Sequence, residues 1–161
     1  MIDTGVFWAV LTKPATLAVL AATALLAWPL GRRRGRLGVL FVLTLGVILA
    51  ATATNRLVHF SAAGVPPYLR EFANPAYVFG GFAGNLERLA NIGLFLPLGL
   101  LATLLWRRPL LVVGSCALLS FLLEAWQGFI GRGGDPVDVV HNTAGAALGV
   151  GLAYLASQGT V

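Results

Sequence analysis

Polar side chains with the types needed for acid–base chemistry or ligand binding gather between residues 124 and 142. Glu124 and Gln127 stand three residues apart, and Asp138 and Asn142 stand four apart. On helices, residues at these spacings share one face, about one turn apart. Ionisable groups inside an apolar chain are costly, and those that persist are usually functional. We therefore predict Glu124 and Asp138 as candidate catalytic carboxyls, each able to act as general base or metal ligand.

Two of the acids in this stretch also have structural interpretations. Glu124 has apolar neighbours, so an ion pair with Arg88 or Arg132 could lock the helices together instead of serving a ligand. Asp135 precedes a proline, an order typical of a helix start in which the aspartate caps the first turn. The cap and the ligand-binding role both remain open for Asp135.

The ligand chemistry of the whole set is that of oxygen donors and arginines. Such oxygens suit hydrogen bonding to sugars, phosphates or peptide amides, and a divalent cation such as Mg²⁺ or Ca²⁺ would also fit. Nucleotide-binding, zinc-protease and Cys–His motifs are absent from the sequence, so we assign no metal ligands and expect no further cofactor. The predicted ligand-binding residues are Asn91, Gln127, Arg132, Asp135, Asn142 and Arg88.

The elements that position these residues are predicted to be membrane helices. The chain has 161 residues, of which 58% are hydrophobic and only 11% charged, whereas a soluble domain has about 25% charged residues. The net charge of +5 does not indicate nucleic-acid binding, because the arginines cluster in short turns between apolar runs, which is a topology signal. The clustered residues are Arg32, Arg33, Arg34, Arg36, Arg107 and Arg108.

The fold class is therefore all-α, a polytopic membrane bundle of about five transmembrane helices forming one domain over residues 1–161. Apolar segments at about 14–30, 37–54, 86–106, 110–130 and 137–156 are long enough, or nearly so, to cross a bilayer. With the arginine turns in the cytoplasm, the N-terminus lies outside and the C-terminus inside. All six acidic residues then fall on the outer side, where the last three spans bring their polar ends to one interface.

Two further patterns concern packing around this predicted pocket. The aromatic extracytoplasmic segment at about 55–85 has no clean helical period; it is either a loop on the outer leaflet or a lid that brings Arg70 and Glu71 to the site. Gly145 and Gly149 form a GxxxG pattern on the same face as Asn142. That pattern favours close packing against a neighbouring span, with Asn142 turned inward.

The polar residues also carry a family resemblance. The run NIGLFLPLG (Asn91–Gly99) is followed by Glu124-x-x-Gln127 and then by Gly131-Arg132-x-x-Asp135-x-x-Asp138-x-x-x-Asn142-x-x-Gly145. This order resembles the VanZ-like family of bacterial membrane proteins, over residues of about 86–155. The resemblance implies a small multispanning protein of the bacterial cell envelope, in a family named for a member associated with resistance to teicoplanin-type glycopeptide antibiotics. It draws attention to Asn91, Glu124, Gln127, Arg132, Asp135, Asp138 and Asn142.

These observations support two main functional hypotheses. In the first, a multi-pass protein of the bacterial cytoplasmic membrane uses an outward polar pocket to bind or shield a lipid-linked peptidoglycan precursor or a lipid headgroup. In the second, it is an enzyme acting on a lipid or peptidoglycan substrate through Glu124 or Asp138. A transporter is weaker, because spans one, two and five carry no acid at mid-depth. The expected partners are membrane lipids and the precursor, without nucleic acid.

Overall fold

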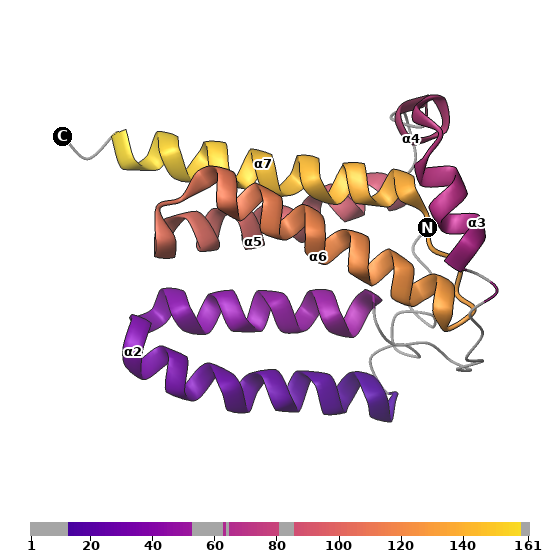
Figure 1. Cartoon of the computed structure of the whole chain (residues 1–161). Coiled ribbons are helices and arrows are strands. Elements are labelled where there is room, and N and C mark those ends of the chain that lie inside the picture. The colour runs from indigo at the N-terminus through magenta and orange to yellow at the C-terminus, as the bar shows by residue number, and fades with distance from the viewer. Residues whose placement is uncertain (1–12, 53–62, 64, 81–85, 159–161) are drawn as a thin grey trace. The chain divides into compact units, whose positions relative to one another are not determined.

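The computed structural model describes residues 13–52, 63, 65–80 and 86–158, and these ranges contain helices and turns but no strand (Figure 1). The prediction of an all-α membrane bundle is confirmed. By its internal contacts the chain divides into two compact units, Met1–Leu57 and Val58–Val161. Each unit is described separately below. The prediction of one continuous membrane domain stays a prediction.

The first unit consists of helix α2 (Pro14–Thr52), which folds back on itself at Gly35. Gly35 has φ 65° and ψ −157°, a conformation that glycine adopts without the steric cost of a side chain. The two limbs pack closely, since a Cβ on Gly46 would overlap the side chain of Thr23. The predicted spans one and two are therefore the limbs of one hairpin with the four clustered arginines at its turn.

The limbs of α2 differ in length. Gly31–Thr52 is long and apolar enough to cross a bilayer, whereas Pro14–Pro29 is a shorter apolar helix. The end of the predicted second span, at residues 53 and 54, lies outside the described residues. In the described part of the chain, four helices thus have the length and composition of membrane spans.

The second unit contains the other three of these spans, which are α5 (Leu86–Trp106), α6 (Pro109–Phe129) and α7 (Pro136–Gln158). Helices α5 and α7 run in the same direction and α6 runs opposite to both (Figure 1). The turn from α5 to α6 is short, with Arg107 at φ 53°. This turn lies at the end of the bundle opposite the turn that joins α6 to α7.

Close contact between α5 and α7 depends on glycines. A Cβ on Gly145 would overlap the backbone of Ile92, and one on Gly149 would overlap the backbone of Leu96. From the other side, a Cβ on Gly99 would overlap the backbone of Ala146. These contacts confirm the packing predicted from the GxxxG pattern. They hold α5 and α7 in a fixed register, with the starts of both helices at one end.

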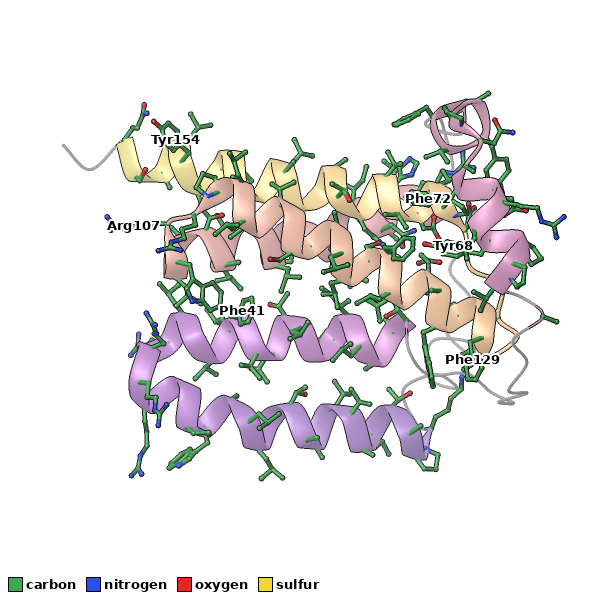
Figure 2. The ribbon with its side chains drawn as sticks, viewed as in Figure 1. Phe41, Tyr68, Phe72, Arg107, Phe129 and Tyr154 are labelled. Atoms are coloured by element: carbon green, nitrogen blue, oxygen red, sulfur yellow. The ribbon has the colours of Figure 1, made fainter. Side chains whose placement is uncertain are left out.

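Two short helices precede the bundle, α3 (Val65–Phe72) and α4 (Pro75–Gly80). Both contact α7, and α3 also contacts α6. In Figure 2, Tyr68 and Phe72 of α3 lie at the end of the bundle opposite Arg107 and Tyr154. No clean helical period marks this segment, so the two helices correct the loop that was one of its two predicted forms. The rest of the predicted aromatic segment (55–62, 64 and 81–85) lies outside the described residues.

Candidate functional site

The carboxyl group of Glu124 is the centre of the candidate site. Glu124 is only 2% exposed, and each of its oxygens accepts one hydrogen bond. Gln127 Nε2 donates to Oε1 at 3.1 Å, and the backbone N–H of Asp135 donates to Oε2 at 3.1 Å. The first bond lies within α6, and the second ties α6 to the turn before α7. Glu124 therefore joins the two helices through neutral N–H donors, and the charge of Arg132 also acts on it.

The turn between α6 and α7 is shaped so that it can lie against Glu124. Asp135 Oδ1 accepts a hydrogen bond from the backbone N–H of Val137 at 2.9 Å, which is the predicted capping role. Gly134 lies directly against the chain at Glu124, because a Cβ there would overlap the Glu124 carbonyl. Any side chain at position 134 would push the turn away and lengthen the Asp135–Glu124 bond.

A second polar pair lies one helical turn further along the same two helices. Asn142 Nδ2 donates to Ser120 Oγ at 2.9 Å, and both residues are buried. Ser120 stands four residues before Glu124 on α6, and Asn142 stands four residues after Asp138 on α7. Asn142 Oδ1 is buried and has no hydrogen-bond partner among the described residues. An unpartnered buried acceptor is uncommon in folded proteins.

Tyr68 covers the Glu124 end of this arrangement. It is 1% exposed, and its hydroxyl donates to the carbonyl oxygen of Phe121 at 3.2 Å. Its ring packs at a centroid distance of 5.6 Å from Phe121 and 6.2 Å from Phe72. Burial, and then the negative charge of Glu124, raise the pKa of Tyr68 above its ordinary value. The phenol is therefore neutral at ordinary pH and stays buried beside the Glu124 end of α6.

A more exposed polar layer surrounds Tyr68. The Tyr77 hydroxyl hydrogen-bonds to the carboxyl of Asp135, and Glu71 and Arg88 lie near enough to act on it electrostatically. Partial burial and then the charge of Asp135 raise the pKa of Tyr77, so this phenol is also neutral at ordinary pH. The layer combines arginine with carboxylates at the end of the bundle where α3 and α4 lie.

The structure brings most of the predicted site residues together. Glu124 bonds to Gln127 and to the backbone of Asp135, and its charged neighbours are Arg132, Asp135 and Asp138. Asn142 lies one helical turn away, paired with Ser120, and Arg88 lies in the more exposed layer near Tyr77. Asn91 is half-buried on α5 and makes no hydrogen bond to the other site residues that the structure describes. Its role as a ligand-binding residue stays a prediction.

Three residues of the site were missed by sequence reasoning. Tyr68, and not the exposed Arg70 or Glu71, is the side chain by which α3 reaches the site. Ser120 has the signal that could have found it, because it precedes Glu124 by one turn on the same helical face. Gly134 carries no chemical group that would mark it in the sequence, and its lack of a side chain permits the contact with Glu124.

The acids of the site do not form a metal centre. Within the described ranges, no group of three or more His, Cys, Asp or Glu side chains is arranged to hold a metal ion. Each oxygen of Glu124 accepts one N–H hydrogen bond, which leaves acceptor capacity but no described group of three metal ligands around it. The residues that the structure describes therefore do not fit a tightly bound divalent cation.

Comparison with protein-family models matches residues 19–157 to the family described as VanZ/LLP1. The match extends well upstream of residues 86–155, where the sequence motifs lie, and includes most of α2. No curated protein and no solved structure gives a significant match.

Proposed function

The chain belongs to the VanZ/LLP1 family. We propose that it binds or shields a lipid-linked cell-wall precursor or a lipid headgroup at the outward-facing side of the cytoplasmic membrane. In this proposal the protein is a multi-pass protein of the bacterial cytoplasmic membrane, with the N-terminus outside and the C-terminus in the cytoplasm. The Arg107–Arg108 turn then faces the cytoplasm and the Glu124 site faces outward. Association with glycopeptide resistance follows from the family and belongs to the proposal.

One observation carries this proposal: the carboxyl of Glu124 is buried near the end of a membrane helix, beside the α6–α7 turn. A carboxyl at 2% exposure is expensive to keep unless it is hydrogen-bonded or serves a ligand. Its two neutral donors satisfy only part of its capacity, since a carboxylate has about four acceptor positions. A donor-bearing ligand would complete the set.

The cover formed by α3 supports a binding site that opens and closes. Helix α3 is attached to α6 by the hydrogen bond of Tyr68 and by the ring contacts of Tyr68 and Phe72 with Phe121, which is a modest anchorage for an eight-residue helix. Displacing α3 would expose Glu124 to the outer leaflet. Binding a precursor there would reduce its accessibility to a large glycopeptide in the same region, which is how shielding would produce resistance.

The proposal is tested in a glycopeptide-susceptible bacterial host that expresses the chain. Glu124→Ala and Asn142→Leu should return teicoplanin susceptibility to the level of the empty host, while Thr103→Val should behave like wild type. Thr103 is a matched control because it is buried in α5 and its hydroxyl bonds only to its own helix, at Gly99 O. Membrane protein levels must be equal in all strains. Full resistance in both site variants would refute the pocket as the cause.

The alternative is an enzyme acting on a lipid or peptidoglycan substrate, and the proximity of Asp138 to Glu124 favours it. Two neighbouring carboxyls can divide the roles of acid and base. Purified protein would then convert a lipid-linked precursor, and Glu124→Gln would lose turnover with binding retained. An absence of product under conditions where the precursor binds would refute this alternative.

A further inference from the structure

The polar residues of α6 and α7 form two stacked layers along one buried seam. The upper layer contains Glu124 with Asp138 as a charged neighbour, and the lower layer contains Ser120 and Asn142. Each lower residue lies four positions from an upper one on its own helix, so the layers are about one turn apart. We call these four residues the α6–α7 seam.

The seam has acceptor positions that receive no hydrogen bond from the described residues. The donors to Glu124 are one amide NH₂ and one backbone N–H, and the amide of Asn142 uses its own NH₂ on Ser120. Asn142 Oδ1, in a residue 2% exposed, receives no hydrogen bond. A buried acceptor without a donor typically costs about 1–3 kcal/mol. The carboxyl and the amide oxygen are thus two acceptors, one turn apart, that the described residues do not saturate.

We propose that the α6–α7 seam binds the primary ammonium group of a membrane-anchored molecule. The inference rests on the proposed function and names the ligand chemistry of the same site. An ammonium carries three N–H donors and a compact positive charge, so it can bond to Glu124 and Asn142 together and offset the charge of the acid. An ionised phosphate diester supplies only acceptors and leaves these acceptor positions unsatisfied.

The surroundings of the seam agree with a headgroup that carries the ammonium beside a negative group. Arg132 is exposed and acts on Glu124 from the α6–α7 turn, and Arg88 lies in the more exposed layer near Tyr77. An arginine at this level suits an anionic group of the same ligand. Two sources share this chemistry, the headgroup of an aminophospholipid and the free amine of a peptide on a lipid-linked precursor.

The experiment measures which lipid remains with the purified, full-length chain after equilibration with mixed vesicles. The vesicles hold equal amounts of phosphatidylethanolamine and phosphatidylcholine with identical acyl chains. Both headgroups are zwitterionic, but only the first has N–H donors. We expect about tenfold enrichment of phosphatidylethanolamine on wild-type protein, the ratio that one charge-assisted hydrogen bond provides. The proposal would be overturned if wild-type protein retained the two lipids equally here and also retained the free and acetylated peptides equally in the second arm described below.

The variants separate the seam from general lipid binding. Glu124→Gln keeps the shape and removes the charge, and Asn142→Leu removes the acceptor; each should abolish the enrichment. Asn142→Asp keeps an acceptor and should retain it. Thr103→Val is the matched buried control and should behave like wild type. Unfolding curves verify that each variant is folded, and enrichment that survives in both Glu124→Gln and Asn142→Leu would also overturn the proposal.

A second arm identifies the source of the ammonium. Phosphatidylcholine vesicles carry a lipid-anchored peptide with either a free or an acetylated lysine amine. Selective retention of the free amine, stronger than that of phosphatidylethanolamine, assigns the site to a peptide-bearing precursor; the reverse order assigns it to the phospholipid. If Glu124→Ala abolishes resistance while no arm shows amine selectivity, the proposed function stands and the ammonium assignment fails. If the protein shows amine selectivity but confers no resistance, the ammonium assignment stands and the proposed function in resistance fails.

Discussion

Replacing Gly149 by alanine should destabilise the bundle, whereas the same change at Gly151 should not. Both glycines lie in α7, two residues apart, but a Cβ at Gly149 would overlap the backbone of Leu96, and one at Gly151 would meet nothing within 4 Å. The gain in helix propensity, about 0.5–1 kcal/mol, is common to both substitutions and cancels in their difference. What remains is the cost of overpacking, typically about 1–3 kcal/mol.

The difference is measured by unfolding each purified variant in mixed micelles with increasing sodium dodecyl sulfate, followed by circular dichroism. Gly149→Ala should unfold at a lower detergent fraction than wild type, and Gly151→Ala at an equal or higher one. If Gly149→Ala and Gly151→Ala unfolded at the same detergent fraction, the backbone contact between α5 and α7 would be refuted. The register that sets Asn91 and Asn142 at the same end of the bundle would then lose its support.

Three other perturbations test the parts of the site. Gly134→Ala would drive a Cβ into the Glu124 carbonyl and toward the Tyr68 ring, and should increase protease cleavage at α3 relative to wild type. Asp135→Ala removes the cap of α7 and should cost about 1 kcal/mol in the same detergent titration, with Asp135→Asn close to wild type. The pKa of Tyr68 is raised above 10.0 in the folded protein, so the phenol of the unfolded chain loses its proton at lower pH than the folded one. The stabilisation from the neutral Tyr68 phenol is therefore complete below pH 10.0 and is lost as the pH rises through the folded-state pKa. Tyr68→Phe should therefore weaken the fold by about 1 kcal/mol near neutral pH and flatten this alkaline loss, as measured by thermal unfolding across pH.

The spans and the polar cluster were predictable because they depend on local patterns. Apolar length identifies membrane helices, and the spacing of Glu124 with Gln127 and of Asp138 with Asn142 identifies faces. The proline after Asp135 favoured a cap as one of two open roles, and the GxxxG pattern predicted close packing of the last span against a neighbouring span without naming which one. Each of these inferences uses residues within two turns of one another.

The remaining features depend on contacts that are distant in the sequence. Tyr68 bonds to a carbonyl 53 residues away, and no local period marks that partner. The choice between an arginine and neutral donors for Glu124 was also open, because it depends on how closely the α6–α7 turn folds back. That approach is set by the missing side chain of Gly134, which the sequence alone does not distinguish from an ordinary turn glycine.

The parallel arrangement of α5 and α7 has a consequence for biogenesis. Helix α7 shares a more extensive contact with α5 than α6 does, although α6 is the immediate neighbour in sequence. During synthesis, α5 and α6 therefore enter the bilayer before their principal partner has been made. Until the α6–α7 turn forms, the carboxyl of Glu124 lacks the hydrogen bond from the backbone N–H of Asp135. The polar end of the bundle is completed only when the final helix inserts, so arrest of translation before Pro136 should leave an immature protein that quality-control proteases can recognise.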